Sequence, residues 1–211
     1  MDFDFTDDQE QLRDAVRKWV DKGYDFERRR GIEKAGGFSR EAYGELAELG
    51  LPGLYIPEEH GGMGMGPVEG MVVMEELGRG IVAEPFTQTL IAGAVLAGYA
   101  PDAVKSAWLP KIASGEYLVV LAQQERAGRY HIAKCEAKAA LAQEKYALTA
   151  IKNIVPAGDY ADAFRRHASS AAFNEKQRHL AVSHRGHQKG ISIVASRHYV
   201  FNSCQRIFFL G

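Results

Sequence analysis

Apolar residues recur at helical spacing through the first 116 positions of the chain. Leu12, Val16 and Val20 are each separated by about one helical turn, so a helix would carry them on a single face. The same period recurs four more times, and the last of these segments is expected to end around Pro110 or Gly115. The pattern predicts five helices and an all-α unit; the expected segments are 6–24, 39–49, 67–80, 84–100 and 102–116.

Residue types that begin and end helices support these boundaries. Thr6 and Ser39 each precede an apolar stripe, where a hydroxyl caps free backbone N–H groups. Pro67 suits a first helical position, because the N–H that proline lacks has no partner there. Gly50 tolerates left-handed backbone and Pro52 lacks an N–H, so the second helix is expected to stop at these residues.

After residue 116 the helical period gives way to short apolar runs. Residues 117–121 are apolar and bounded by Gly115 and polar residues, which predicts a buried strand. Further strands are expected within 146–155, 189–201 and 205–210, whereas the polar stretch 165–190 has no clear period and is expected to be a loop. The order predicts an α+β fold. An all-α domain over 1–116 would precede a β-rich barrel or sandwich domain over 117–211 that is atypical after about 165.

The composition is that of an ordinary globular protein, with 46% hydrophobic and 25% charged residues. The longest apolar run, at 90–100, is too short to cross a bilayer. The acidic N-terminus lacks the basic and then apolar order of a signal peptide, so we expect a cytoplasmic protein. In that compartment Cys135 and Cys204 would stay reduced.

Charge is unevenly distributed along the chain. The formal net charge is −1, but residues 165–211 contain eight Arg or Lys, one acid (Glu175) and five of the seven histidines. Such a tail is compatible with binding of nucleic acid, a metal or an acidic partner, and equally with a basic domain surface. We expect neither nucleic acid nor a membrane as a partner.

No motif assigns a reaction. The cysteines are far apart, and His184 and His187 could share a metal only on a helix, so no metal site is predicted. The glycine-rich stretch 58–66 follows no strand and is expected to be a compact loop rather than a phosphate cradle. Glu75 and Glu76 lie in an expected helix and are interpreted as its solvated edge.

Residues 3–164 resemble the acyl-CoA dehydrogenases. The matching stretches are FTDDQEQLRDAVRKWV, ELAELGLPGLYIPEEHGGMGMG, MVVMEELGRG and LPKIASGEYLVVLAQQE. QQERAGRYHIA and NIVPAGDYADAF are most similar to the subgroup that includes the small subunit of pimeloyl-CoA dehydrogenase. The resemblance implies an FAD-dependent oxidoreductase of fatty acid metabolism, which removes two hydrogens across Cα and Cβ of an acyl-CoA substrate.

In this family two strand ends hold the flavin, largely through backbone groups. The first pattern, Thr-Glu-Pro-x-Ala-Gly-Ser-Asp, begins here at Gln123, and Arg129 replaces its serine. The second, Lys-x-Trp-Ile-Thr-Asn-Gly, begins at Lys152, with Ile154 in place of the aromatic residue and Pro156 in place of the hydroxyl. The Gln123 amide can still donate a hydrogen bond and Arg129 can pair with a pyrophosphate. The resemblance implies eight cofactor-binding residues: Leu121, Gln123, Ala127, Gly128, Arg129, Ile154, Val155 and Pro156.

The family's C-terminal four-helix bundle is expected to be absent, since the recognisable similarity stops with the β-rich domain. That bundle carries the usual catalytic glutamate and the main oligomer interface, so no catalytic residue is assigned. A homo-oligomer, or a heteromer with a related acyl-CoA dehydrogenase subunit, would cover the surfaces left bare. The alternative is a non-catalytic scaffold subunit that has lost flavin binding.

Overall fold

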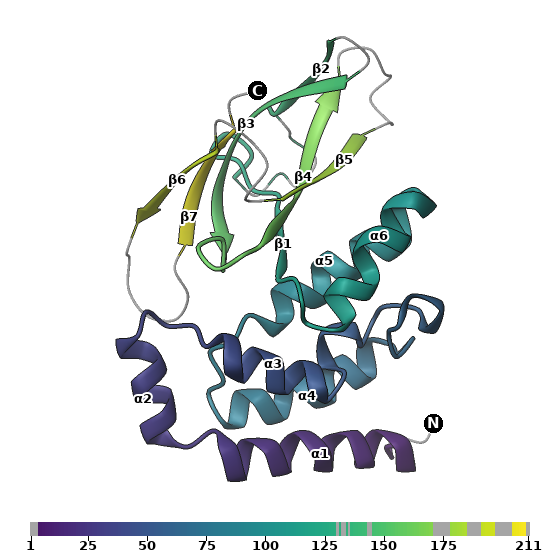
Figure 1. Cartoon of the computed structure of the whole chain (residues 1–211), viewed down its shortest axis with the longest axis vertical. Coiled ribbons are helices and arrows are strands. Elements are labelled where there is room, and N and C mark those ends of the chain that lie inside the picture. The colour runs from purple at the N-terminus through teal and green to yellow at the C-terminus, as the bar shows by residue number, and fades with distance from the viewer. Residues whose placement is uncertain are drawn as a thin grey trace. The chain divides into compact units, whose positions relative to one another are not determined.

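The computed structural model describes residues 4–129, 131, 134, 136–142, 145–170, 178–184, 191–196 and 204–209. The chain divides into two compact units, Met1–Glu116 and Tyr117–Gly211. Among the described residues the helices belong to the first unit and the strands to the second (Figure 1).

The first unit is helical, as the apolar periodicity predicts. Its α-helices are α1 (Asp7–Gly23), α2 (Phe26–Lys34), α3 (Arg40–Glu48), α4 (Pro67–Arg79), α5 (Phe86–Tyr99) and α6 (Asp102–Ala113). The short 3₁₀ helices η1 (Leu51–Gly53) and η2 (Glu58–His60) lie between α3 and α4, and η2 falls within the stretch 58–66 that was expected to be a compact loop.

The capping residues also occur where the sequence predicts them. Thr6 and Gln9 form a reciprocal capping box at α1, because the Thr6 hydroxyl accepts the Gln9 N–H at 3.3 Å and the Gln9 side chain accepts the Thr6 N–H at 3.0 Å. The Ser39 hydroxyl accepts the Ala42 N–H at 3.1 Å. Gly50 follows α3 with a φ of 76°, the left-handed conformation that glycine adopts without steric cost.

The helical prediction was wrong in one detail, and of its two alternatives for the end of the last helix the one at Gly115 is confirmed. The prediction omitted α2, whose FERRRGIEK sequence buries only Ile32 and therefore shows no apolar stripe. Pro110 does not end α6, which continues to Ala113. Proline removes one backbone hydrogen bond, and three further residues still complete the last turn before Gly115 turns the chain with a φ of 72°.

Helices α1 and α4 lie side by side and run in the same direction (Figure 1). Gln9 donates to Glu69 at 2.7 Å near both N-termini, and Arg79 bonds Asp21 at 2.7 Å near both C-termini. Their apolar faces meet in one core cluster, which includes Leu12, Val16, Val20, Val73 and Leu77. Parallel packing places helix ends of like partial charge side by side, which is unfavourable. The hydrogen bonds and ion pairs between the two helices offset this repulsion.

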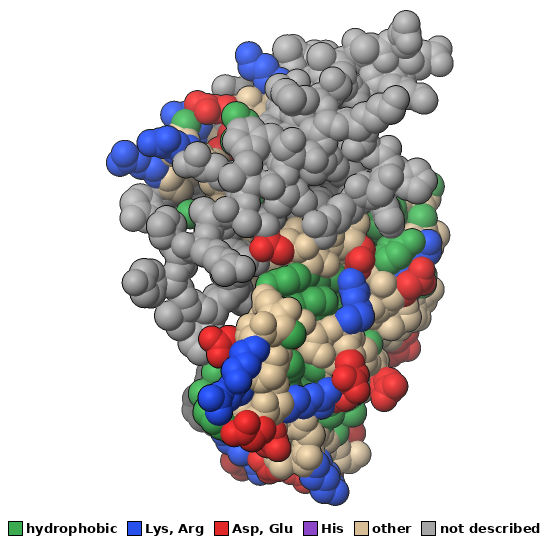
Figure 2. All heavy atoms as spheres, turned by 60° about the vertical axis from the view of Figure 1, so that its left-hand side comes forward, with side chains coloured by type: hydrophobic (Ala, Val, Ile, Leu, Met, Phe, Trp, Pro, Cys, Tyr) green, Lys and Arg blue, Asp and Glu red, His purple; other side chains and the backbone are tan. Residues whose placement is uncertain are grey.

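Glu76 is the most buried acid of this contact. Its side chain is 3% exposed and bonds Arg17 at 2.7 Å and Arg79 at 2.9 Å. The interpretation as a solvated edge was therefore wrong for Glu76, although it holds for Glu75, which is 66% exposed. Acidic and basic side chains are interspersed over the described surface of the helical unit, as such ion pairs require (Figure 2).

The second unit contains seven described strands. They are β1 (Val119–Ala122), β2 (Lys138–Ala142), β3 (Lys145–Pro156), β4 (Ala163–Ser170), β5 (Arg178–His184), β6 (Ile191–Ser196) and β7 (Cys204–Phe209). Their hydrogen-bonded order is β1-β4-β2-β3-β7-β6, and β5 pairs with β4. The expectation of a loop over 165–190 was wrong for β4 and β5, because cross-strand pairing forms there without apolar alternation in the sequence.

Gly80 provides a test of the close approach between α1 and α4. A Cβ added at Gly80 would lie 2.5 Å from Cγ1 of Val20, whose branched side chain has little rotamer freedom. We expect Gly80→Ala to lower the free energy of unfolding by about 1–3 kcal/mol. The measurement is urea unfolding followed by helical circular dichroism.

The matched control is Gly78→Ala, two residues earlier in the last turn of α4. Nothing lies within 4 Å of a Cβ added at Gly78, and alanine is the better helix former. This variant should unfold at the wild-type urea concentration or slightly above it. Equal destabilisation by both substitutions would contradict the argument from close approach.

Glu76 provides a test with pH as the variable. The hydrogen bond from Arg17 lowers the pKa of Glu76; burial opposes this and the hydrogen bond from Arg79 reinforces it, so the pKa lies below its ordinary value. A carboxylate with a lowered pKa stabilises the fold fully above its unfolded pKa, and this contribution is lost as pH falls through the folded pKa.

We therefore expect Glu76→Gln to lower the free energy of unfolding by about 1–3 kcal/mol at neutral pH. The difference from wild type should begin to shrink below about pH 4, near the ordinary pKa of a glutamate, and should keep shrinking as pH falls through the lowered pKa of Glu76. Glu75→Gln is the control at the neighbouring, exposed position and should have little effect at either pH. A wild-type advantage that is unchanged at pH 3 would refute the assignment.

Candidate functional site

The segment that follows β1 leaves the sheet and returns to the same edge. β1 pairs with β4 as far as Ala122 opposite Arg166, and β2 joins the same strand from Lys138 opposite Ser169. The described residues within 123–137 therefore form an excursion between two strands that follow one another along β4. This excursion contains the first of the two predicted flavin-binding stretches.

The second stretch lies at the end of β3, where the strand is bulged. Lys152 pairs with Ile207 of β7 and Val155 with Gln205, so β3 contains one more residue than β7 over this interval. Ile154 lies within the bulge with a φ of 51° and an exposed side chain. A bulge bends its strand and redirects a side chain, which here turns an isoleucine to the surface.

Hydrogen bonds join the excursion to the end of β3. The Asn153 N–H donates to the Gln124 carbonyl at 2.9 Å. The Lys152 ammonium donates to the Gln123 carbonyl at 3.3 Å and to the Glu125 carboxylate at 2.6 Å. The structure thus brings together the two stretches that the sequence analysis singled out, although they are separated by almost thirty residues.

Glu125 and Lys152 form a buried ion pair. The Lys152 side chain is 0% exposed and that of Glu125 is 4% exposed. The carboxylate also accepts the N–H groups of Glu136 and Ala137, the latter at 3.1 Å. Burial raises the pKa of Glu125, but the hydrogen bonds from Lys152 and Glu136 outweigh that effect and hold it below its ordinary value.

Glu125 and Lys152 are not among the eight site residues predicted from the sequence. A signal was present, since Lys152 is the one charged residue within the expected strand YALTAIKNIV. A lysine in a buried strand needs a partner, but its identity depends on the fold of the excursion, which no local pattern encodes. Glu125 lies at the proline position of the first family pattern, which implies no polar role for that position.

The eight predicted residues differ in their exposure. Val155 and Gly128 are buried, and the Gly128 N–H donates to the Glu125 carbonyl at 3.0 Å. Arg129 is exposed and Ile154 is 57% exposed. The half-buried residues are Leu121, Gln123, Ala127 and Pro156.

Backbone strain is concentrated at these strand ends. Of the non-glycine residues with positive φ among the described residues, Arg129 (43°), Ile154 (51°) and Ala157 (57°) all lie there; Ile81 (51°) is the other. Such conformations are uncommon for residues with a Cβ and are most unusual for a branched isoleucine. Local strain of this kind gathers at ligand sites, which supports the strand ends as the candidate site.

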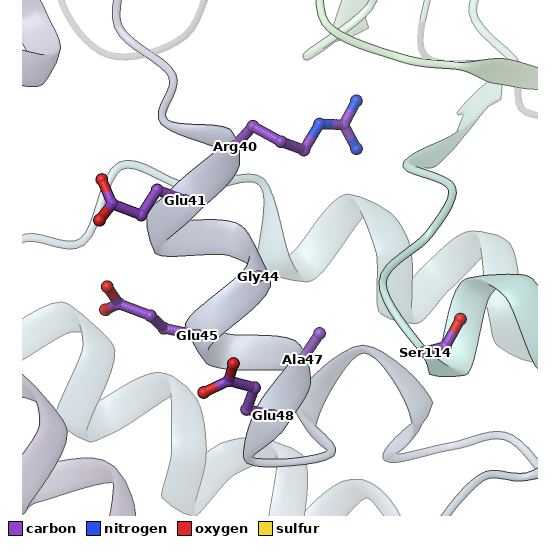
Figure 3. Close-up of a pocket in the computed structure, with 7 residues that line it drawn as sticks. All are labelled: Arg40, Glu41, Gly44, Glu45, Ala47, Glu48 and Ser114. Carbon is purple, nitrogen blue, oxygen red and sulfur yellow. The ribbon is translucent and has the colours of Figure 1, made fainter.

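The first unit offers a polar hollow of about 530 Å³ beside α3 (Figure 3). It is lined by Arg40, Glu41, Gly44, Glu45, Ala47, Glu48 and Ser114. Glu45 is already engaged by the Arg28 guanidinium at 2.7 and 2.9 Å and by the Trp19 ring N–H at 2.8 Å. The hollow lacks the apolar lining of a small-molecule site, and we assign it no ligand.

Glu84 is a further buried carboxyl, located before α5. Its side chain is buried, and burial, the largest effect, raises the pKa of Glu84 above its ordinary value. Tyr24 is buried beside it, and the pKa of its hydroxyl is also raised, chiefly by burial. Enclosure in the helical core gives this pair no access to a substrate, so we assign it a structural role.

Several sequence-based expectations fall partly outside the described residues. Cys135, His187 and His198 are among these positions, as is much of the rest of the basic tail. Within the described part of the chain, no group of three His, Cys, Asp or Glu residues could hold a metal ion. No described helix is both long and apolar enough to span a membrane.

Comparisons with known proteins agree on one family. The family model "Acyl-CoA dehydrogenase, N-terminal domain" matches residues 6–116. The chain is 30% identical to the mitochondrial isovaleryl-CoA dehydrogenase of Pongo abelii over 164 residues, which cover 74% of this chain and 38% of that protein.

Two solved structures show the same fold. The ChsE4-ChsE5 complex from Mycobacterium tuberculosis matches with a TM-score of 0.86 and 25% identity, over 100% of this chain and 56% of that one. A glutaryl-CoA dehydrogenase from Mycobacterium smegmatis in complex with FADH2 matches with a TM-score of 0.84 and 17% identity, over 97% of this chain and 53% of that one. The chain thus spans little more than half the length of these structures.

Ile154 tests whether the strain at the strand end is real. Asparagine tolerates left-handed backbone far better than a β-branched residue does, so Ile154→Asn should raise the free energy of unfolding by about 1 kcal/mol. Calorimetric unfolding measures the change.

Ile151→Asn is the matched control, since Ile151 is 53% exposed in the same strand and is not among the residues with positive φ. This substitution should bring no gain, because asparagine is a poor strand residue. A gain of equal size at both positions would show that surface polarity, rather than backbone strain, is responsible.

Proposed function

The chain belongs to the acyl-CoA dehydrogenase family, and from that membership we propose that it is a subunit of an FAD-dependent oxidoreductase acting on an acyl-CoA thioester. The proposed reaction is α,β-dehydrogenation. The observation that carries the proposal is the junction of residues 123–129 with residues 152–158, the two stretches that correspond to the family's flavin patterns. The chain length of the acyl group is left open.

The residues at this junction fit a flavin dinucleotide. Ile154 offers an exposed apolar surface of the kind that lies against an isoalloxazine ring. Gln123 offers an amide that donates and accepts hydrogen bonds. Arg129 offers an exposed guanidinium, whose planar donors match the two oxygens of a phosphate group.

FAD, when bound, would supply the acceptor for the hydride that leaves the substrate's β-carbon. The groups of this chain would act on the cofactor by binding and orienting it. Ile154 would exclude water from one side of the ring, Gln123 would hydrogen-bond its polar edge, and Arg129 would neutralise pyrophosphate charge. No described residue is assigned as the base that takes the α-proton.

We further propose that the working form is an oligomer or a heteromer with a related subunit. The complex among the solved structures is a precedent for assembly of two different chains in this fold. The exposed apolar side chains of α4, which include Met71 at 51% and Met74 at 38%, offer a surface that such assembly could cover. Light scattering at micromolar concentration tests this, and a monomer would contradict it.

The alternative is a scaffold subunit that has lost the flavin. Pro156 favours this alternative, because it lacks the backbone N–H that any other residue would offer at this strand end. The visible absorption spectrum separates the two proposals. Flavin bands that persist after addition of FAD and desalting support the oxidoreductase subunit, and a colourless protein supports the scaffold.

Arg129 allows a sharper test of the same proposal. We expect Arg129→Gln to weaken FAD binding about tenfold or more, because a charge-assisted hydrogen bond to phosphate is lost. Titration with FAD, followed by quenching of flavin fluorescence, measures the dissociation constant.

Arg126→Gln is the control, since Arg126 is also exposed and lies three residues away in the same turn. It should leave FAD affinity within about twofold of wild type, apart from a general charge effect. An equal loss in both variants would point to diffuse electrostatic attraction and against a specific contact with Arg129.

A further inference from the structure

The Glu125 carboxylate joins the two ends of the excursion 123–137 by hydrogen bonds. Oε1 of Glu125 accepts the Ala137 N–H at 3.1 Å, and its other oxygen accepts the Glu136 N–H. The bonds join the start of the excursion to its end, eleven and twelve residues later. β4 holds the chain by strand pairing before the excursion, at β1, and after it, at β2. Between these two strands the carboxylate holds the chain instead.

The turn within the excursion is compact. A Cβ added at Gly128 would meet the carbonyl oxygens of Glu125, His131 and Lys134 at 3.3–3.5 Å. Three backbone hydrogen bonds of 2.7–3.0 Å connect these residues in sequence, from Gly128 to Glu125, His131 to Gly128 and Lys134 to His131. The position of Arg129 thus follows from the position of Glu125.

The position of Glu125 is set in turn by Lys152. The ammonium bonds both the Glu125 carboxylate and the Gln123 carbonyl, so it holds the excursion at two points beside the bulge of β3. Neither member can leave readily, because separation would strand a charge in a site where the two side chains are 0% and 4% exposed.

We propose that Glu125 and Lys152 are positioning residues, which hold Gln123 and the Gly128–Arg129 turn against Ile154 in the arrangement that binds the flavin. The proposal rests on the proposed function, and it concerns residues that touch the excursion and not the cofactor. Flavin affinity then depends on an ion pair that the ligand does not contact.

The test compares Lys152→Met and Glu125→Gln with the wild-type chain. Each variant should weaken FAD binding about tenfold or more, the loss expected when one partner of a buried charged hydrogen bond is removed. The visible circular dichroism of bound flavin should change, because the ring would be held in a different orientation. Lys138→Met, at an exposed lysine on the neighbouring strand, is the control and should match wild type.

A second readout does not depend on flavin. Trypsin cleaves after Arg126, Arg129 and Lys134, all exposed and all within the fastened segment. In this test the clamp means the Glu125 carboxylate with its bonds to Lys152, Glu136 and Ala137. Loss of the clamp should accelerate cleavage at these sites about tenfold, because the carboxylate no longer holds the two ends of the excursion together. Cleavage elsewhere in the chain is the internal reference.

The double variant Glu125→Leu/Lys152→Met separates positioning from stability. Replacing a buried ion pair by apolar residues of similar size often preserves stability, so its unfolding midpoint should approach wild type. The bonds from Glu136, Ala137 and to Gln123 remain lost, so weak FAD binding and fast cleavage should persist. Recovery of wild-type FAD affinity in the double variant would overturn the proposal and show a purely structural pair.

The outcomes for this inference and for the proposed function are distinct. If wild type retains FAD and the single variants bind it with unchanged affinity, the positioning role is overturned and the proposed function stands. If wild type retains no FAD, the proposed function is overturned together with the flavin role of the pair. In that case unchanged trypsin cleavage in the variants would also refute the role of the pair in holding the excursion. Faster cleavage would support that role without any role in flavin binding.

Discussion

A lysine and a glutamate that are withdrawn from water together impose the main constraint on the strand ends. Burial of either charge alone costs several kcal/mol even after relaxation, so Lys152 and Glu125 stay together or the segments around them unfold. The carboxylate has four hydrogen-bonding directions and uses three of them on Lys152, Glu136 and Ala137. That degree of satisfaction is what makes a buried pair tolerable. Because the two partners lie in different segments, their attraction fixes the geometry between segments.

The strained backbone at the same place is a consequence of this constraint. Arg129, Ile154 and Ala157 occupy left-handed conformations that cost about 1–2 kcal/mol each without glycine. No local sequence preference favours them, least of all at an isoleucine. Their conformations are imposed by bonds on either side, such as those from Lys152 to Glu125 and from Asn153 to Gln124. Strain supported by surrounding structure is typical of a site whose shape matters more than its stability.

The sequence predicts those features that depend on neighbouring residues. Thr6 and Ser39 mark helix starts because capping is a local hydrogen bond, and the period of Leu12, Val16 and Val20 reports one buried face. Prediction failed where a distant partner decides the outcome. The burial of Glu76 depends on Arg17 from another helix, and β4 owes its strand to β1 and β5 rather than to an apolar alternation. The flavin patterns could be located by resemblance, but the bond that joins them could not.

Charge pairs serve two different purposes in the two units. Along α1 and α4, arginines that are about half exposed neutralise Glu76, and these cations can return to water if the acid is removed. At the strand ends, by contrast, neither partner can return to water without opening the segment. Glu125 also lies where the family pattern has proline, so this chain has exchanged a residue that stiffens the backbone locally for one that fastens it from a distance. The strand-end arrangement therefore depends on Lys152 as well as on its own sequence, and a change at either residue of the pair affects both flavin patterns together.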